Sequence, residues 1–330
     1  MYALGIDVGS VSTNMVLLDS NKDVVEKIYI RTKGRPMDSV KTGLSIICKK
    51  YDDKQIRAVG TTGSGRMIAS IQVGADVVKN EITAHAVAAI NIDSDVKTII
   101  EIGGQDSKII LIRDGVVVDF AMNTVCAAGT GSFLDRQAER LEIPIEKFGG
   151  YALKAKVPVR IAGRCAVFAE SDMIHKQQLG YDNYDIIGGL CDALVRNYLS
   201  NVGKGKEILN KVIFQGGVAA NKGIHKAFEN TLQLPISIPP HHDVMGAIGV
   251  AILAYEKIEF EKSRTKFKGF SVASDEFQSR SFVCAGCPNQ CEIVSVLENQ
   301  KEIGFFGDRC GKYSEASLAT VGYGSGVGSG

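Results

Sequence analysis

The sequence predicts an α/β protein of two related lobes, followed by a small cysteine-rich extension. A strand, a glycine-containing turn and a second strand open the chain, and residues 97–115 repeat this plan. The 330 residues exceed the roughly 100–200 that one hydrophobic core usually serves. Four of the eight cysteines lie between residues 284 and 310. Length, repeat and cysteine distribution therefore indicate two lobes and an appended segment.

The first lobe begins with a predicted hairpin. Apolar residues flank a polar turn at residues 7–10, a pattern typical of two strands joined by a short loop. The rest of this lobe is expected to contain helices over residues 37–50 and 81–91 and strands over residues 57–60 and 70–78.

The second lobe combines the repeated hairpin with several helices. Helical periodicity is found over residues 131–142, 166–179 and 184–203. Residues 211–217 predict a strand that ends in a glycine turn and leads into a further helix. Backbone amides at such a turn can point at a bound ligand.

The domain boundaries follow from these patterns. We expect a first lobe of residues 1–95, on which an amphipathic segment at residues 243–260 packs, and a second lobe of residues 96–242. Charged residues at 261–269 predict a linker, and a cysteine-rich extension follows at 270–315. Glycine and serine dominate the end of the chain, so residues 316–330 are expected to form a flexible tail.

Composition and charge argue against several classes of protein. Hydrophobic residues make up 45% of the chain and charged residues 23%, which is ordinary for a soluble globular protein. A formal net charge of +1 argues against nucleic acid as a partner. We expect no membrane association and a cytoplasmic location, because no signal peptide pattern and no apolar run of about 20 residues is found.

Three glycine turns at strand ends indicate a nucleotide site. They are IDVGS at residues 6–10, EIGGQDSK at 101–108 and FQGGVAAN at 214–221, and no P-loop sequence is present. Glycine lets backbone amides approach phosphate oxygens, and an acid at the turn can hold magnesium through water. Each turn alone is equally compatible with a structural hairpin. Together they resemble the actin, hexokinase and Hsp70 superfamily, whose fold has two ribonuclease H-like lobes.

This resemblance to actin-like ATPases implies roles for particular residues. Asp7, Gln105 and Asp106 are expected to position magnesium and the attacking water, and Glu101 stands where many relatives have Asp. The positions expected to bind ATP or ADP are Gly9, Ser10, Ser12, Gly103, Gly104, Gly129, Gly131, Gly216, Gly217 and Asn221, the last three near adenosine.

Two cysteines, Cys126 and Cys165, each precede a predicted helix. Free amides and the helix dipole at a helix N-terminus favour a thiolate and the negative charge of an iron-sulfur cluster. A cubane cluster normally takes four cysteines, so two identical chains about a two-fold axis would supply the set. Burial as small hydrophobic residues is the alternative for such a pair. Core packing is the role we expect for Cys48 and Cys191, which lie in apolar helical stripes.

The sequence around the two cysteines is similar to a known family. NTVCAAGTGSFLD and CAVFAES, with NEITAHA, EIGGQD and GGVAAN, resemble the activators of 2-hydroxyacyl-CoA dehydratases within the BadF/BadG/BcrA/BcrD ATPase family. The resemblance covers about residues 1–257. It implies an ATP-dependent one-electron reductase: a homodimer with one bridging 4Fe-4S cluster held by Cys126 and Cys165 of both chains.

The same resemblance implies the partners of the protein. The electron acceptor would be an iron-sulfur protein, either a 2-hydroxyacyl-CoA dehydratase or a double-cubane cluster protein, and the donor a ferredoxin or flavodoxin. Two other functions remain open from the residues themselves. One is a small-molecule kinase of the same fold, of the sugar or N-acetylglucosamine type, and the other is a non-enzymatic ATP-binding regulator.

The cysteine-rich extension offers a second candidate metal site. Its four thiols are Cys284, Cys287, Cys291 and Cys310. Structural zinc and a second iron-sulfur cluster both fit thiols at such spacing, and a metal-free role is the alternative.

Overall fold

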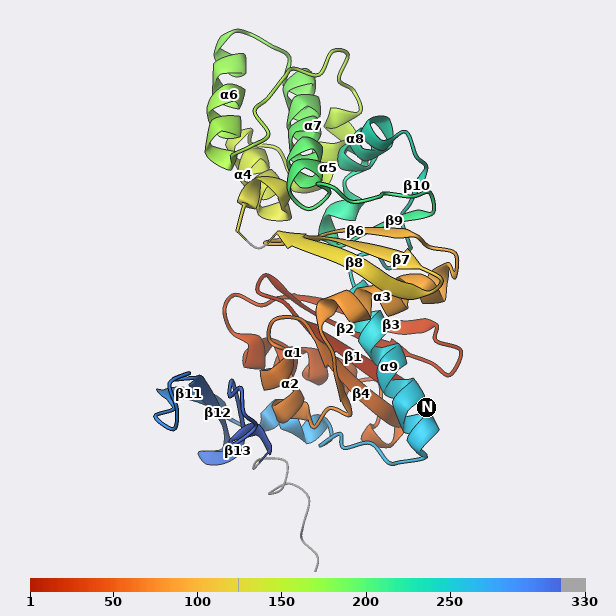
Figure 1. Ribbon diagram of the computed structural model, residues 1–330, viewed down its shortest axis with the longest axis vertical. Helices are drawn as coiled ribbons and strands as arrows, with labels where there is room; N and C mark the ends of the chain where they lie inside the picture. The colour runs from red at the N-terminus through yellow and green to blue at the C-terminus, as the bar shows by residue number, and fades with distance from the viewer. Residues whose placement is uncertain (124, 316–330) are drawn as a thin grey trace, which may run out of the picture. The chain divides into compact units, whose positions relative to one another are not determined.

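The computed structural model describes residues 1–123 and 125–315, and the chain divides into two compact units (Figure 1). Unit 1 comprises Met1–Asn80 and Gly246–Gly330, and unit 2 comprises Glu81–Met245. The lobe boundaries given above stay a prediction. The predicted flexible tail, residues 316–330, lies outside the described residues.

Unit 1 is built on a mixed sheet of strand order β3-β2-β1-β4-β5. Its strands are β1 (Tyr2–Val8), β2 (Ser12–Leu18), β3 (Val24–Arg31), β4 (Ile56–Thr62) and β5 (Val77–Val78). Its helices are α1 (Pro36–Ile47), the short 3-10 helix η1 (Asp53–Gln55), α2 (Arg66–Val73), α9 (Met245–Glu261, in unit 1 from Gly246) and the 3-10 helix η4 (Phe270–Ser274).

Helices cover both faces of this sheet. Leu4 and Ile6 of β1 face a core shared with Leu44 of α1. On the opposite face α9 lies against the strands so closely that a Cβ at Gly5 would be 1.9 Å from the Ala247 carbonyl oxygen. Glycine at position 5 is therefore required for the close approach of α9 to β1.

Unit 2 is built on a second mixed sheet, of strand order β10-β9-β6-β7-β8. Its strands are β6 (Thr98–Ile102), β7 (Ser107–Arg113), β8 (Val116–Asn123), β9 (Val212–Gln215) and β10 (Ile236–Ser237). Its helices are α3 (Glu81–Ile92), η2 (Ala127–Gly129), α4 (Gly131–Arg140), α5 (Ile145–Ala152), α6 (Ala166–Gln178), α7 (Asn183–Asn201), η3 (Gly217–Ala220) and α8 (Lys222–Leu232).

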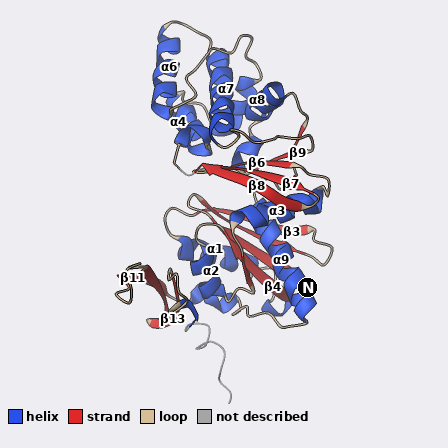
Figure 2. Cartoon of the chain, viewed as in Figure 1, coloured by secondary structure: helices blue, strands red, loops and turns tan. Residues whose placement is uncertain are grey.

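The hydrophobic core of unit 2 lies between one face of the sheet and the helices α4 to α8 (Figure 2). Ile100 and Ile102 of β6 pack in this core with Leu190 of α7 and Phe228 of α8. Residues between them in sequence, such as Glu101, must face the other side of the sheet because side chains alternate along a strand.

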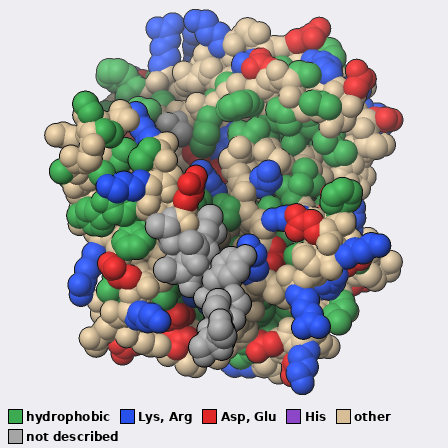
Figure 3. All heavy atoms as spheres, turned by 60° about the horizontal axis from the view of Figure 1, so that its bottom comes forward, with side chains coloured by type: hydrophobic (Ala, Val, Ile, Leu, Met, Phe, Trp, Pro, Cys, Tyr) green, Lys and Arg blue, Asp and Glu red, His purple; other side chains and the backbone are tan. Residues whose placement is uncertain are grey.

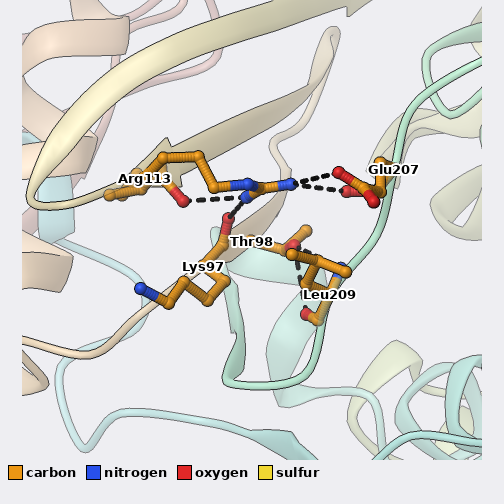
Figure 4. Close-up of polar contacts among 6 residues, drawn as sticks. Lys97, Thr98, Arg113, Glu207 and Leu209 are labelled. Atoms are coloured by element: carbon orange, nitrogen blue, oxygen red, sulfur yellow. Dashed lines mark hydrogen bonds and ion pairs between the residues drawn. The ribbon is translucent and has the colours of Figure 1, made fainter.

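Polar contacts fix one end of this sheet to the loop that precedes β9 (Figure 4). The Arg113 guanidinium donates to the carbonyl oxygen of Lys97 at 3.1 Å and pairs with the Glu207 carboxylate at 3.2 Å. Thr98 exchanges hydrogen bonds with the backbone of Leu209, each at 3.2 Å. These bonds satisfy backbone groups of the loop that the strands alone leave unpaired.

The cysteine-rich extension folds as an antiparallel sheet within unit 1. Its strands, in the order β11-β12-β13, are β11 (Phe277–Val283), β12 (Glu292–Glu298) and β13 (Lys301–Phe306). The sheet packs on α2, because a Cβ at Gly304 would lie 2.8 Å from Ile71 Cγ2. The preceding charged segment is also tied to unit 1, since Asp76 accepts hydrogen bonds from Thr265 and Lys266 at 2.7 Å each.

Most of the elements expected from sequence are present. Both hairpins and the helices expected in the second lobe agree with the structure to within a few residues. The strand expected over residues 70–78 is wrong: residues 66–73 form α2, and only residues 77–78 are extended. The short apolar run is compatible with either element by pattern, and packing of Ala69 and Val73 in the unit 1 core decides for the helix.

The surface carries charge of both signs. Figure 3 shows acidic, basic and hydrophobic side chains interspersed over the face that it draws. In the part of the chain that the structure describes, no helix has the length and apolar character needed to cross a membrane.

Candidate functional site

The first predicted phosphate hairpin lies in unit 1. β1 and β2 place Asp7 opposite Asn14, and the Gly9 amide closes the turn by donating to the Ser12 carbonyl oxygen at 2.9 Å. The turn after the parallel strand β4 brings Gly63 beside the acid: a Cβ there would lie 2.5 Å from Asp7 Oδ1. Gly63 also has a φ of 89°, which favours glycine. Sequence analysis missed this residue, and its signal was the TTGSG run after a buried strand.

The second predicted hairpin lies in unit 2 and is joined to the start of α4. The Gly131 amide donates to the Gly103 carbonyl oxygen at 2.9 Å, and the Ser132 amide donates to the Gly104 carbonyl oxygen at 2.9 Å. A Cβ at Gly131 would lie 3.0 Å from that Gly103 oxygen. The structure thus brings Gly103, Gly104 and Gly131 together, while the neighbouring Gln105 side chain is exposed.

The third glycine turn lies beside the second. Gly216 has a φ of 90°, and a Cβ there would lie 2.7 Å from Glu101 Oε1. Gly217 is exposed with open space above its Cα. Asn221 is the N-cap of α8, where its side chain accepts from the amides of Gly223 and Ile224 at 3.0 and 3.1 Å. Capping accounts for the side-chain oxygen of Asn221. The role of Asn221 near adenosine stays a prediction.

A buried lysine joins the acids of unit 2. Lys108 of β7 is 2% exposed, and its ammonium lies 2.8 Å from Glu81, 3.0 Å from Glu101 and 2.9 Å from Asp106. Glu81 is the first residue of α3, Glu101 lies opposite Lys108 in the sheet register, and Asp106 belongs to the glycine turn. Two carboxylate oxygens point at the turn itself: a Cβ at Gly103 would lie 3.1 Å from Asp106 Oδ1 and 3.4 Å from Glu101 Oε1.

Burial and charge shift the ionisation of this group. Burial alone would lower the pKa of Lys108, but the negative charges of Glu101, Asp106 and Glu81 outweigh it and hold that pKa above its ordinary value. Burial raises the pKa of Glu101 to about 7. Burial, with a smaller contribution from Lys108, lowers the pKa of His85 to about 3, so this imidazole is neutral near pH 7. The ammonium therefore stays charged throughout the neutral range, whereas the charge of Glu101 changes near pH 7.

Gln215 is a further site residue that sequence analysis missed. It ends β9, lies beside Glu101 in the parallel register, and has 0% exposure. Neither its amide nitrogen nor its carbonyl oxygen has a hydrogen-bond partner within the described residues. A buried amide without partners costs free energy, so this side chain is suited to water or a ligand at the turns. Its signal was a polar residue between an apolar strand and the Gly216 turn.

The first cysteine segment begins a helix, as expected, but a short one. Cys126 is the N-cap of the 3-10 turn η2, and α4 begins only at Gly131. The first amides of α4 bind the Gly103–Gly104 turn, as described above. Cys126 is instead held by Asn123, whose side chain accepts from the Cys126 amide at 2.9 Å and donates to its carbonyl oxygen at 2.8 Å.

The second cysteine, Cys165, is the N-cap of α6, as predicted. Asn197 of α7 links the two cysteine segments. Its amide nitrogen donates to the Gly163 carbonyl oxygen at 2.6 Å and lies 3.8 Å from Cys126 Sγ. A Cβ at Gly129 would lie 2.7 Å from Asn197 Oδ1, so Gly129 makes room for this side chain. Asn197 was missed because nothing in its local sequence distinguishes it from a core helix residue.

Exposed apolar side chains lie near both cysteines in the sequence. Cys126 and Cys165 are partly exposed, and their neighbours Val125, Val167 and Phe168 are 94%, 69% and 66% exposed. Of the two cysteines expected in the core, Cys191 is buried at 1%, which confirms the expectation. Cys48 is exposed at the end of α1, so that expectation is wrong. The helical stripe of α1 ends at Ile47, one residue before it.

The C-terminal thiols lie at one end of the β11-β12-β13 sheet. Register pairs Val283 with Glu292 and Val294 with Phe306, so the β11–β12 connection and the residues after β13 leave the same end. The Cys284 amide donates to the Cys291 carbonyl oxygen at 2.8 Å, and the Gly286 amide donates to Cys284 Sγ at 3.4 Å. Among residues 1–123 and 125–315, no three His, Cys, Asp or Glu side chains are arranged to hold a metal ion. A second metal site in the extension stays a prediction.

Two hairpin-bearing mixed sheets with glycine turns define an actin-like ATPase fold, and solved structures agree with this class. The activator of 2-hydroxyisocaproyl-CoA dehydratase from Clostridium difficile, with bound ADPNP, matches 79% of this chain and 97% of its own, with a TM-score of 0.73 and 30% identity. Component A of the Acidaminococcus fermentans (R)-2-hydroxyglutaryl-CoA dehydratase matches 78% of this chain and 99% of its own, with a TM-score of 0.72 and 33% identity.

The chain belongs to the BadF/BadG/BcrA/BcrD ATPase family, whose model matches residues 4–254. The (R)-2-hydroxyglutaryl-CoA dehydratase activating ATPase of Acidaminococcus fermentans is 36% identical over 78% of this chain and 98% of its own length. The 2-hydroxyisocaproyl-CoA dehydratase activator of Clostridioides difficile is 32% identical over 81% and 99%. The resemblance inferred from sequence is confirmed, and the cysteine-rich extension lies beyond the family match.

Proposed function

We propose that the chain is an ATP-dependent one-electron reductase that activates an iron-sulfur partner protein. The observation that carries the proposal is a pair of adjacent residues in α7. Asn197 holds both cysteine segments, and Tyr198 donates to the Lys108 carbonyl oxygen at 2.7 Å, in the strand that follows the Gly103–Gly104 turn. One turn of helix thus contacts both the thiol segments and the strand that follows the glycine turn, so packing along β7 and α7 links the two places.

Cys126 and Cys165 are suited to hold half of a 4Fe-4S cluster. Both thiols are partly exposed, and the Asn197 amide near Cys126 Sγ is a donor of the kind that stabilises cluster sulfur. When bound, such a cluster supplies single low-potential electrons. A second copy of the chain would contribute the other two thiols and cover the exposed Val125, Val167 and Phe168.

The glycine turns are suited to hold ATP or ADP with magnesium. Asp7 and Asp106 offer carboxylate oxygens, the donor type that magnesium prefers. In unit 1, Gly9, Ser10 and Ser12 are suited to contact phosphate, and in unit 2 the turns that contain Gly103, Gly104, Gly131 and Gly216 are suited to the same role. Gln105 would orient the attacking water. Differential binding of ATP and ADP to two conformers supplies the free energy for the activation step.

The partners follow from the relatives. The matched proteins are named as activators of 2-hydroxyglutaryl-CoA, 2-hydroxyisocaproyl-CoA and lactoyl-CoA dehydratases. We propose an acceptor of this dehydratase type or a double-cubane cluster protein, with ferredoxin or flavodoxin as electron donor, in the cytoplasm. The domain division predicted from sequence, with lobes 1–95 plus 243–260 and 96–242, is part of the same proposal.

The test is an anaerobic comparison of cysteine variants. Cys126→Ser and Cys165→Ser should each remove the iron and acid-labile sulfide of one 4Fe-4S cluster per dimer and abolish the reduction of an iron-sulfur acceptor, while nucleotide binding is retained. Cys48→Ser is the matched control, because Cys48 is an exposed cysteine of unit 1 outside the proposed site. Full iron content in both site variants, or phosphorylation of a small-molecule acceptor by the wild type, would reject the reductase in favour of the kinase.

The same preparations test the C-terminal thiols. We propose that Cys284, Cys287, Cys291 and Cys310 bind zinc or a second iron-sulfur cluster once drawn together at their end of the sheet. Zinc and iron analysis of Cys284→Ser should show loss of one metal centre per chain, with the centre of Cys126 and Cys165 retained. Equal zinc and iron contents in wild type and variant would contradict the second site.

A further inference from the structure

The three carboxylates of unit 2 converge on a point that a lysine ammonium fills. Glu81, Glu101 and Asp106 come from a helix start, a central strand and a turn, yet each places an oxygen within 3.0 Å of Lys108 Nζ. Three carboxylates around one point are the ligand type that hard divalent cations take in proteins. With the ammonium in place, the three carboxylates do not form a metal site within residues 1–123 and 125–315.

Gln215 gives a second, independent indication that the place is built around a ligand. Its side chain has 0% exposure, lies beside Glu101 in the parallel register, and has no hydrogen-bond partner among the described residues. The row Gln215, Glu101 and Lys108 therefore crosses three neighbouring strands on one face of the sheet. A fully buried carboxamide without partners is suited to hold a water molecule of a hydrated cation.

We propose that Lys108 is a tethered cation that prevents the Glu81, Glu101 and Asp106 cluster from binding a free divalent ion, so that magnesium enters only with the nucleotide. Lys108 is thus a specificity-determining residue for magnesium nucleotide, and acts through the acids it positions. The inference rests on the proposed function in one respect, that the nucleotide carries magnesium. It requires neither hydrolysis nor the cysteines.

Titratable groups face Lys108 from several elements of unit 2. They are Glu81 and His85 from α3, Glu101 from β6, Asp106 from the turn, and the Tyr198 hydroxyl, which donates to the Lys108 backbone. His85 is neutral near pH 7, as described above. Lys108 is the cation that these three acids face, so its removal makes the cluster more negative and leaves the buried Glu101 without its cation.

The test is a titration with calcium or magnesium in the absence of nucleotide, with the melting temperature as the measured quantity. For Lys108→Ala we expect the melting temperature to fall by about 10 °C, because buried carboxylates lose their partner. Added calcium should restore most of this loss in a saturable way, whereas potassium chloride of equal ionic strength should not. Calcium should act better than magnesium, since carboxylates spaced for an ammonium need less contraction to reach the roughly 2.3–2.6 Å of calcium ligation than the roughly 2.0–2.1 Å of magnesium.

Two further variants make the result specific. Lys108→Met removes the charge but fills the space, so calcium should restore its stability much less than that of Lys108→Ala. The double variant Lys108→Ala with Glu101→Gln should lose the calcium effect. Absence of any saturable calcium effect in Lys108→Ala would overturn the proposal, as would an equal effect in the double variant.

The wild type decides the matter where Lys108→Ala cannot be recovered in folded form. The wild type should bind no calcium at this cluster without nucleotide in a calorimetric titration. A bound calcium ion that disappears in Glu101→Gln would overturn the proposal. If the calcium results fail while ATP turnover and iron content are intact, the specificity role of Lys108 is rejected and the proposed reductase stands. The reverse pattern rejects the reductase alone.

Discussion

Two regions of unit 2 hold their chemistry in different ways. Around Lys108, a buried ammonium and the buried Glu101 carboxyl are paired within one chain, together with the partly exposed Glu81 and Asp106. Around Cys126 and Cys165, the thiols are partly exposed beside apolar side chains such as Phe168. A buried charge must find its partner inside the fold, whereas an exposed ligand set can be completed by a second chain. The region around Lys108 is therefore prebuilt within one chain, whereas the thiol region, under the proposed function, is completed by a second chain.

The largest expected effect concerns the Lys108 cluster. The comparison fails if this cluster contributes no more to the free energy of unfolding than a surface ion pair does. Lys108→Met should lower the free energy of unfolding by about 3–5 kcal/mol, because buried carboxylates lose their counter-charge. Lys226→Met is the matched control: its ammonium lies 3.6 Å from Glu229 on the exposed side of α8, and its loss should cost below about 1 kcal/mol. Urea unfolding of both variants measures the difference. Similar losses would show that the cluster is not a prebuilt unit.

A second test uses the pH dependence of the same region. The folded pKa of His85, about 3, lies below its ordinary value of 6.5, so its contribution to stability is complete above pH 6.5 and is lost as the pH falls towards 3. The stability advantage of the wild type over His85→Gln should therefore shrink by about 1.4 kcal/mol per pH unit within this window.

Glu101 titrates in the opposite sense and must be separated from His85. Its raised pKa of about 7 means that its contribution is present at low pH and is lost as the pH rises through 7. Glu101 is present in both proteins, so the difference between wild type and His85→Gln removes most of its effect. Urea unfolding of both proteins from pH 7 to pH 4 measures this difference in the free energy of unfolding. A difference that stays constant over this range would show that His85 is not held neutral.

Sequence patterns predicted the parts of this molecule that depend on local chemistry. The hairpin turns at Gly9 and Gly103 and the N-cap position of Cys165 follow from glycine, acid and cysteine at strand and helix ends. Lys108, Gln215 and Asn197 could not be predicted in this way. Each acts on residues distant in sequence, and its partner is set by strand register or by helix packing.

Two departures from expectation at cysteines have the same physical reason. Cys126 begins a helix as expected, but that helix is the short turn η2, because the amides of α4 are used by the Gly103–Gly104 turn, which is a tertiary contact. Cys48 continues the apolar stripe of α1 in sequence, yet the helix ends one residue before it. Periodicity predicts a face of a helix and does not fix the residue at which that face leaves the core.

Asn197 joins the two regions, so its removal sharpens the comparison. Asn197→Ala leaves the Gly163 carbonyl oxygen without the donor that lies at 2.6 Å, and should cost about 1–3 kcal/mol. Because Cys126 loses the same side chain, iron content after anaerobic reconstitution should also fall. Asn183→Ala, at the exposed start of the same helix, is the control. Equal iron content and stability in both variants would remove Asn197 from the proposed coupling.

The smallest effect on stability is expected at the surface beside the cysteines. Phe168 is 66% exposed on α6, so Phe168→Ser should change the free energy of unfolding of the monomer by less than about 0.5 kcal/mol. If a second copy covers this surface, the same change should weaken the dimer about tenfold or more, because a buried aromatic side chain contributes strongly to an interface. Phe260→Ser is the matched control, since Phe260 is 89% exposed on α9, in unit 1. Anaerobic sedimentation of both variants measures their dimerisation. Equal dimerisation would show that the apolar residues near the cysteines are not the interface. The thiol region would then not be one that a second chain completes, and the contrast with the Lys108 region would fail.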